Sequence, residues 1–339
     1  MIYTTNAIES LNRSLREWLK TKGCFPNEES VHKLLDWALN NIAKKLTLSK
    51  IAYPNQRGLC SPFPTPPMLS PQLLQHYRQL SQQPLTVVDV ETTGGLAFKH
   101  RMTELSVLHA SLDEGVQRQQ STLLNPEVLI PAKIVRITGI TPELVAVAPT
   151  AAEALPDFLP LLQTGVLTAH NLEFDYGFLQ AEYRRLGVEF TRPEWMQLCT
   201  VELSRLMLPD LPSRSLPKLV QHFQFPIDTS HRAAADTLAC WLLAERLLTE
   251  LCNEEDTVLL ARFARQVMPL KYAAQLLGQR QKKAAKLLMS LGIEGKVVAR
   301  GSSSTLLYRR GDVERAVLEL AQAGALGATE PAQLLLLGE

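Results

Sequence analysis

The chain has 339 residues, 46% of them hydrophobic and 20% charged, and its formal net charge is +1. This composition is ordinary for a soluble globular protein with room for two or three domains. No apolar run approaches the roughly 20 residues that span a bilayer, and the polar amino terminus argues against a secretory signal. Five cysteines without a C-x-x-C pair argue against a disulfide framework or a zinc site. We therefore expect a cytoplasmic protein without membrane association.

Charge is segregated along the chain. Residues 1–82 carry a net charge of +5, residues 83–252 carry −7 and residues 253–339 carry +3. The acidic middle segment suits a domain that concentrates cations, and the basic flanks would supply affinity for phosphate groups.

Residues 1–47 are predicted to form two helices with a turn between them, because apolar side chains recur at helical spacing on both sides of TKGCFPN. The motifs Y-T-T-N-A-I-E-S-L-N-R and K-G-x-F-P-N resemble the carboxy-terminal end of Mutator-type DDE transposases, and the resemblance places Glu9 at the last acid of the DDE triad. The rest of a transposase core is absent. We interpret the segment as a remnant of an insertion element fused in frame, or as the result of a misassigned start codon.

Residues 48–82 are rich in proline, including Pro62, Pro64, Pro66 and Pro67. Such a segment does not hold regular structure for long. We expect an extended linker, with at most a short helix over 73–80.

An apolar, β-branched run at 85–90 predicts a buried strand that ends at Thr-Thr-Gly-Gly. Side chains alternate along a strand, so Asp89 and Glu91 point to the same side and can share one cation. No basic residue between Thr86 and Phe98 could pair with them locally, which favours a metal over a structural ion pair.

Two later segments add polar residues at the starts of predicted helices. Asp175 follows the apolar run 166–169, close to where a helix begins, and it could either ligate a metal or simply complement the helix dipole. His231 and Asp236 are five residues apart, about 500° of helical turn. They would face different directions within one helix, so we place His231 before the helix and Asp236 inside it. Together these acids predict two-metal phosphodiester hydrolysis.

The motifs V-V-D-V-E-T-T-G, I-T-G-I-T, H-N-L-E-F-D-Y-G-F-L and H-R-A-A-A-D occur in this order within residues 83–252. This segment resembles the DEDDh-type 3′→5′ exonucleases, the family of the proofreading subunit of bacterial DNA polymerase III, of RNase T and of oligoribonuclease. The resemblance implies that Asp89, Glu91 and Asp236 ligate the first of two Mg²⁺ or Mn²⁺ ions. It further implies that Asp89 bridges to the second ion, that Asp175 acts on it through water, and that His231 is the general base.

The same resemblance implies that Thr92 and Thr93 line the terminal nucleotide with their backbone, and that Asn171 lies beside it. The chemistry of His231 supports its role independently, because an unperturbed pKa near 6.5 lets histidine accept a proton at neutral pH. The alternative is a core histidine bonded to the backbone.

Along residues 83–252 the first predicted elements are strands, and helices alternate with them later. This order predicts an α/β domain with a mixed sheet and helices on both faces. The resemblance implies the RNase H-like fold. The predicted elements are strands at 85–90, two strands within 103–124 and a strand at 166–169, and helices at 151–162, 174–186, 200–208, 215–223 and 232–251.

Residues 253–325 predict a small carboxy-terminal module: a helix, a turn at Gly278, a second helix and two β-prone runs at 296–300 and 305–309. This order resembles the winged-helix modules of excisionases and MerR-type proteins. The basic residues of this module would bind DNA phosphates; they are Arg280, Lys282, Lys283 and Lys286. The alternative interpretation is a lysine-rich helix face that is only exposed to solvent. For the tail, 326–339, the sequence predicts nothing definite.

The leading hypothesis is a metal-dependent 3′→5′ exonuclease that releases nucleoside 5′-monophosphates from single-stranded DNA ends, in proofreading or repair and with a DNA polymerase or repair complex as a partner. One alternative is an exoribonuclease acting on short RNA. Another is a DNA-binding protein that uses the nuclease fold only as a scaffold; the filling of all five catalytic positions argues against it.

Overall fold

A computed structural model describes residues 68–227, 232–300 and 303–322, all within one compact unit that spans Gly58–Glu339. The predictions for the transposase-like segment with Glu9, for His231 and for the tail therefore lie outside the described residues.

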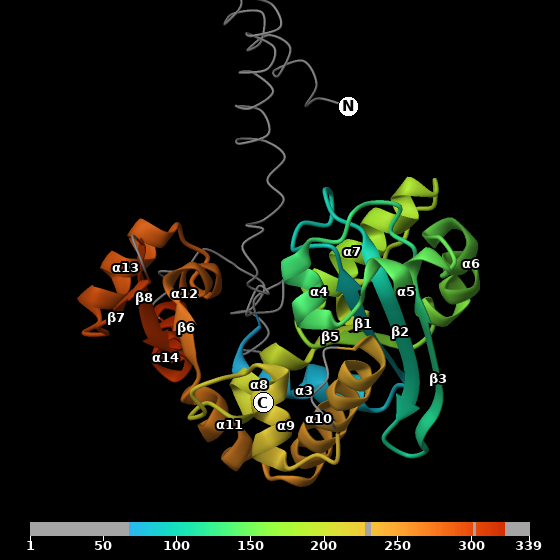
Figure 1. Ribbon diagram of the computed structural model, residues 1–339. Helices are drawn as coiled ribbons and strands as arrows, with labels where there is room; N and C mark the ends of the chain where they lie inside the picture. Colours follow the sequence, from blue (N-terminus) through green and yellow to red (C-terminus); the bar gives the residue numbers. More distant parts are fainter. Residues whose placement is uncertain (1–67, 228–231, 301–302, 323–339) are drawn as a thin grey trace, which may run out of the picture. The chain divides into compact units, whose positions relative to one another are not determined.

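A five-stranded mixed sheet forms the centre of the larger domain (Figure 1). Its strands follow the order β3-β2-β1-β4-β5; β1 is antiparallel to β2, β2 is antiparallel to β3, and β4 and β5 run parallel to β1. The strands are β1 (Leu85–Thr92), β2 (Met102–Ser111), β3 (Gly115–Leu123), β4 (Val166–Ala169) and β5 (Gln197–Cys199). The α/β class and the mixed sheet flanked by helices are confirmed.

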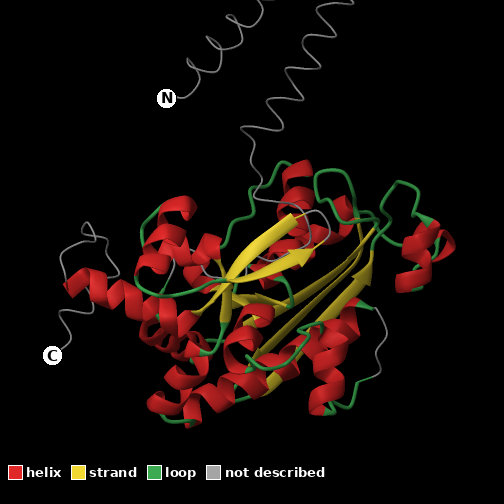
Figure 2. Ribbon diagram, turned by 90° about the vertical axis from the view of Figure 1, so that its left-hand side faces the viewer, coloured by secondary structure: helices red, strands yellow, loops and turns green. Residues whose placement is uncertain are grey.

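Helices flank this sheet (Figure 2). They are α3 (Ser70–Ser81), α4 (Ala132–Thr138), α5 (Pro142–Ala146), α6 (Ala151–Leu162), α7 (Leu172–Arg185), α8 (Thr200–Met207), α9 (Leu216–Phe223) and α10 (Ala233–Asn253), with a 3₁₀ turn at Glu194–Met196. The sequence did not predict α4, α5 or β5, which are short and lack a clear period. None of the described helices carries an apolar stretch long enough to cross a membrane.

The alternation of β1 divides the core in two. Leu85 and Val87 join one apolar cluster with α3, α8, α9 and α10, whereas Val88 and Val90 join a second cluster with α6 and α7. Asp89 and Glu91 continue the first series, because every second side chain of a strand lies on the same face. This alternation directs both acids toward the face of the sheet that α10 covers.

Residues 70–81 correct the linker prediction. They form α3, a helix of 12 residues that contains the short helix expected over 73–80 and extends it at both ends, where an extended chain was expected. Leu73, Leu74, Tyr77 and Leu80 are each at most 3% exposed and belong to the same core as α10. The apolar residues of α3 recur at helical spacing and face a preformed core, so packing outweighs the proline-rich context.

The carboxy-terminal module contains a three-stranded antiparallel sheet in the order β6-β8-β7. The predicted order of helix, turn at Gly278, helix and hairpin is observed, with α11, β6 and α14 in addition. Its elements are α11 (Asp256–Ala264), β6 (Val267–Pro269), α12 (Leu270–Leu276), α13 (Gln281–Ser290), β7 (Lys296–Arg300), β8 (Ser303–Arg309) and α14 (Arg310–Gln322). The winged-helix resemblance itself stays a prediction.

Candidate metal and active site

Three acidic side chains converge where β1 ends. One ligand oxygen from each of Asp89, Glu91 and Asp236 lies within 4.8 Å of the other two, and all three residues are half-buried. Asp89 and Glu91 come from β1, and Asp236 comes from the first turn of α10. The structure thus brings together the three residues that the resemblance assigns to the first cation, while their role stays a prediction.

The electrostatics of this cluster favour a bound cation. Burial raises the pKa of Asp89 well above its ordinary range, and the charge of Asp175 raises it further. Burial likewise raises the pKa of Glu91 to about 8, with Asp236 as its main acidic neighbour. Neighbouring carboxyl groups repel one another and therefore resist ionisation. A bound cation offsets this repulsion and lets them become anionic. Because all the ligand atoms are carboxylate oxygens, the site fits a hard divalent cation such as Mg²⁺ or Mn²⁺.

Asp175 lies beside this cluster without joining the three. It is 3% exposed in the first turn of α7, and its Oδ1 accepts a hydrogen bond of 3.1 Å from the backbone N–H of Val90. Its pKa is raised by burial, although this hydrogen bond opposes the rise. The structure therefore places a fourth acid, fully buried, next to Asp89, which a helix-dipole role alone does not require.

Thr92 is the last residue of β1 and Thr93 begins the loop that follows, and both are buried. The Thr92 hydroxyl donates to the carbonyl oxygen of Gly94 at 2.9 Å. Thr93 exchanges two hydrogen bonds with Arg101, through its backbone N–H (2.9 Å) and its hydroxyl oxygen (3.0 Å). These bonds hold the loop against the end of the strand, where the resemblance expects the terminal nucleotide.

Asn171 has a left-handed backbone conformation, with φ of 84° and ψ of 53°, at the start of α7. Few non-glycine residues adopt this conformation, and asparagine is among those that tolerate it best. It lets the chain turn sharply from β4 into α7, which places Asn171 and Asp175 on the same turn-and-helix unit. Its contact with a nucleotide stays a prediction.

His231 lies outside the described residues, directly before Arg232. His170 is a poor alternative base. Its two ring nitrogens are within 2.9 Å of Thr200 Oγ1 and 2.8 Å of the Arg214 carbonyl oxygen, and burial lowers its pKa to about 4. His170 therefore joins β4 to the segment before α9.

Sequence reasoning missed two residues beside the site, Glu104 and Arg232. Glu104 lies on β2, directly opposite Glu91, and pairs with Arg232 at the start of α10. A charged residue inside the apolar strand segment M-T-E-L-S-V-L was the available signal. Although no basic residue lies near the acids of β1 in the sequence, the start of α10 brings an arginine beside them.

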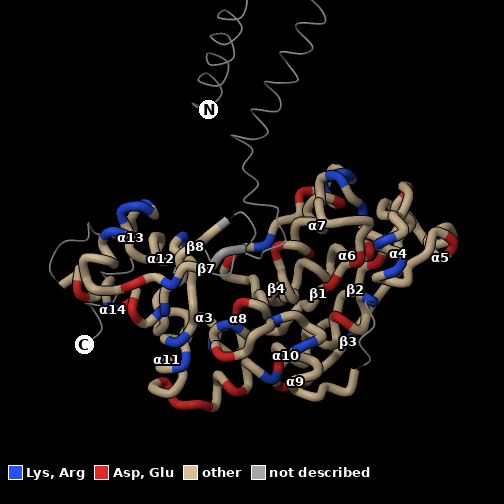
Figure 3. Tube along the Cα trace, turned by 60° about the vertical axis from the view of Figure 1, so that its left-hand side comes forward, with Lys and Arg blue, Asp and Glu red and all other residues tan. Residues whose placement is uncertain are grey.

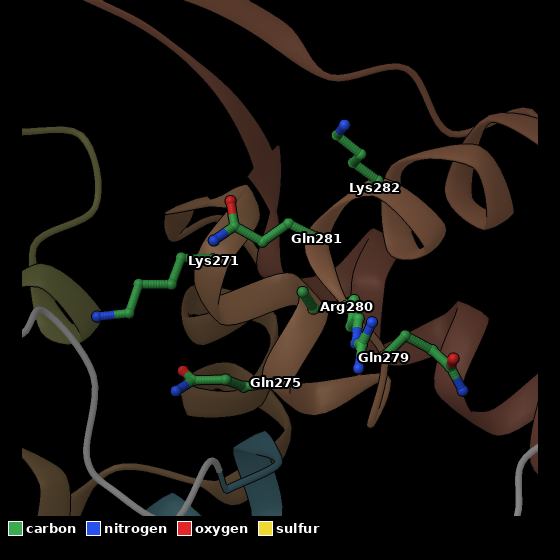
Figure 4. Close-up of a pocket in the computed structure, with 7 residues that line it drawn as sticks. Lys271, Gln275, Gln279, Arg280, Gln281 and Lys282 are labelled. Carbon is green, nitrogen blue, oxygen red and sulfur yellow. The ribbon is translucent and has the colours of Figure 1, made fainter. Parts of the chain in front are cut away.

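The four basic residues predicted to bind DNA all lie on α13 or directly before it (Figure 3). Arg280, Lys282, Lys283 and Lys286 are exposed, and none of them forms an ion pair with another described residue. Arg280 and Lys282 also line an open pocket of about 490 Å³ between α12 and α13 (Figure 4). Other polar side chains of the pocket are Lys271, Gln275, Gln279 and Gln281.

Comparisons with known proteins match two segments of the chain to protein families. A family model described as Exonuclease matches residues 86–243, and one described as Transposase, Mutator family matches residues 1–49. DNA polymerase III PolC-type of Oceanobacillus iheyensis is 33% identical over 178 residues, which are 52% of this chain and 12% of that protein. A solved structure of exonuclease I has a TM-score of 0.44 at 18% identity and covers 52% of this chain and 42% of its own.

DNA polymerase III subunit epsilon of Aquifex aeolicus is 31% identical to this chain over 186 residues, which make up 54% of this chain and 89% of that protein. The matched family segment contains β1, α7 and the first turn of α10, the three elements that carry the acids. The chain therefore belongs to the exonuclease family.

Proposed function

We propose that the chain is a divalent-metal-dependent 3′→5′ exonuclease that removes nucleoside 5′-monophosphates from DNA ends. The observation that carries the proposal is the convergence of Asp89, Glu91 and Asp236 within 4.8 Å. Support for DNA as the substrate comes from the named relatives, which are DNA polymerase III proteins. The same relatives support a DNA polymerase or repair complex as a partner.

In this proposal each group has a defined task. Asp89, Glu91 and Asp236 hold the first cation, and Asp175 helps to hold a second. Divalent cations in such sites lower the pKa of water and stabilise the charge on the leaving oxygen. His231 takes the proton of the attacking water, whose oxygen bonds to phosphorus while the bond from phosphorus to the 3′ oxygen breaks. The released 3′ oxygen takes up a proton from solvent water. The products are a 5′-monophosphate and a chain with a new 3′ hydroxyl.

We also propose that the surface formed by Arg280, Lys282, Lys283 and Lys286 binds the phosphates of the same nucleic acid. Four exposed cations without acidic partners among the described residues favour this over a purely structural role. Binding there would keep a strand near the nuclease between successive cleavages.

The proposal is tested with DNA and RNA oligonucleotides of equal sequence, labelled at the 5′ end and incubated with the full chain and Mn²⁺. We expect the DNA to shorten one nucleotide at a time, and His231→Ala to slow this by about 10² to 10⁴-fold. The matched control is His222→Ala, an exposed histidine on α9. Activity that survives excess EDTA would contradict metal dependence, and faster shortening of RNA would favour the exoribonuclease alternative.

A further inference from the structure

Glu104 and Arg232 form a multiple-contact ion pair between β2 and the start of α10. Arg232 Nε lies 3.2 and 3.1 Å from the two Glu104 carboxylate oxygens, and its Nη2 lies 2.7 Å from Oε1. Glu104 Oε2 also accepts a hydrogen bond of 3.0 Å from the backbone N–H of Ala233. The Glu104 side chain is 4% exposed, so it is a buried charge whose partners satisfy it.

The pair lies directly beside the cation site. Glu104 is opposite Glu91 in the antiparallel pairing of β1 and β2, so both side chains lie on the face covered by α10. Both oxygens of Glu104 are nevertheless occupied by Arg232 and Ala233. Glu104 is therefore not available as a fourth ligand. Its charge raises the pKa of Asp89 and Glu91 directly, and its remaining influence on the site passes through its partners.

The partners of Glu104 connect it to Asp236 through hydrogen bonds. Arg232 is the residue at the amino-terminal cap of α10, and its carbonyl oxygen accepts a hydrogen bond of 3.1 Å from the backbone N–H of Asp236. The first N–H groups of a helix have no partner within the helix, and a carboxylate that accepts from them fixes that end. Glu104 thus holds in place the one helical turn that carries Asp236.

We propose that Glu104 and Arg232 are positioning residues for the cation site: the ion pair fixes the first turn of α10 so that Asp236 reaches Asp89 and Glu91. This inference rests on the proposed metal-dependent function. The inference predicts that loss of either partner weakens cation binding, even when the partner removed is the positively charged Arg232.

A second ion pair provides a matched control. Glu182 on α7 is 1% exposed, accepts from Arg101 Nε at 2.9 and 3.2 Å, and accepts from the backbone N–H of Met102 at 3.1 Å. Glu182 also pairs with Arg185 at 3.1 Å. Its partners are therefore arginine side chains and a backbone N–H, as for Glu104, but its bonds join the carboxy-terminal half of α7 to the start of β2, and these parts carry none of the three converging acids. Loss of either pair should lower stability, and only loss of the first should change cation binding.

The experiment measures Mn²⁺ binding to the full chain by isothermal titration calorimetry, together with thermal unfolding. Glu104→Gln should weaken Mn²⁺ binding by about 10 to 100-fold, and Glu182→Gln should leave it within about twofold. At limiting Mn²⁺, kcat of Glu104→Gln should fall and recover as Mn²⁺ is raised, while KM for the oligonucleotide stays nearly constant.

Arg232→Met separates positioning from simple charge effects. Removal of a nearby positive charge would tighten Mn²⁺ binding if only electrostatic attraction mattered, whereas loss of positioning weakens it. Arg232→Lys should recover part of the affinity, and these two variants keep the test decisive if Glu104→Gln does not fold. Unchanged or tighter binding by Arg232→Met, or equal losses of affinity in Glu104→Gln and Glu182→Gln, would overturn the inference. A wild-type chain that binds no Mn²⁺ would instead refute the proposed function.

Discussion

The carboxylate of Asp175 accepts a hydrogen bond from the backbone N–H of Val90, the residue between Asp89 and Glu91. One buried acid of α7 is therefore attached to the strand that carries two others. Asp175→Asn keeps an acceptor for this N–H but removes the charge. It should fold normally and lower kcat by about 10²-fold, measured on a labelled oligonucleotide.

Asp175→Leu is the matched variant that removes the acceptor as well. The unsatisfied N–H of Val90 should then lower the free energy of unfolding by about 1 to 3 kcal/mol. If the two variants are equally stable, the hydrogen bond contributes nothing to the fold.

Without bound metal, the ionised Asp89 carboxylate should lower the free energy of unfolding, so that its removal stabilises the protein. A carboxyl whose pKa is raised by folding destabilises the folded state once the pH exceeds its unfolded value, and the pKa of Asp89 is raised by burial and by neighbouring acids. In EDTA at pH 7, Asp89→Asn should be more stable than the wild type, and it should be inactive when Mn²⁺ is restored. The control is Asp157→Asn on the exposed side of α6, which should change neither quantity.

His170 should make the protein sensitive to acid. Burial lowers its pKa from 6.5 to about 4 in the folded state, so between these values the unfolded chain binds a proton that the folded chain does not. The free energy of unfolding is therefore highest above about pH 6.5. It falls by about 3 kcal/mol as the pH drops toward 4. Urea unfolding at pH 7 and pH 4.5 should show a smaller loss for His170→Gln than for the wild type. The exposed His222→Gln should behave like the wild type.

The helix before β1 should prove to be part of the nuclease domain. Leu73 of α3 is fully buried, so Leu73→Ala should destabilise the protein by about 2 to 5 kcal/mol. Gln75→Ala, on the exposed side of the same helix, should stay within about 0.5 kcal/mol of the wild type. Equal denaturation midpoints for the two variants would restore the prediction of a linker that reaches residue 82.

The basic surface of α13 should determine the salt dependence of DNA binding. Replacement of Lys282, Lys283 and Lys286 together by glutamine should flatten the slope of log affinity against log salt by about one unit for each phosphate that the variant no longer binds. Lys218→Gln, an exposed lysine on α9, is the control. Identical slopes, measured by fluorescence anisotropy, would remove the phosphate-binding role.

Local patterns in the sequence were sufficient for most of the elements around the site. The apolar β-branched run before Asp89 predicted β1, and the period of two along a strand placed Asp89 and Glu91 on one side. The spacing of His231 and Asp236 placed Asp236 inside the helix, as observed in α10. These predictions depend on the backbone geometry of a single element, which the residues of that element determine by themselves.

Contacts between distant segments were decided only by the tertiary structure. The convergence of Asp236 with the acids of β1 and the pairing of Glu104 with Arg232 both require α10 to lie across the sheet, and the position of Glu104 opposite Glu91 requires the register of β1 and β2. The burial of α3 likewise depends on a core built from residues far along the chain. Such contacts join residues without a fixed spacing, so the sequence determined which groups the site contains, and the packing of sheet and helices determined which of them meet.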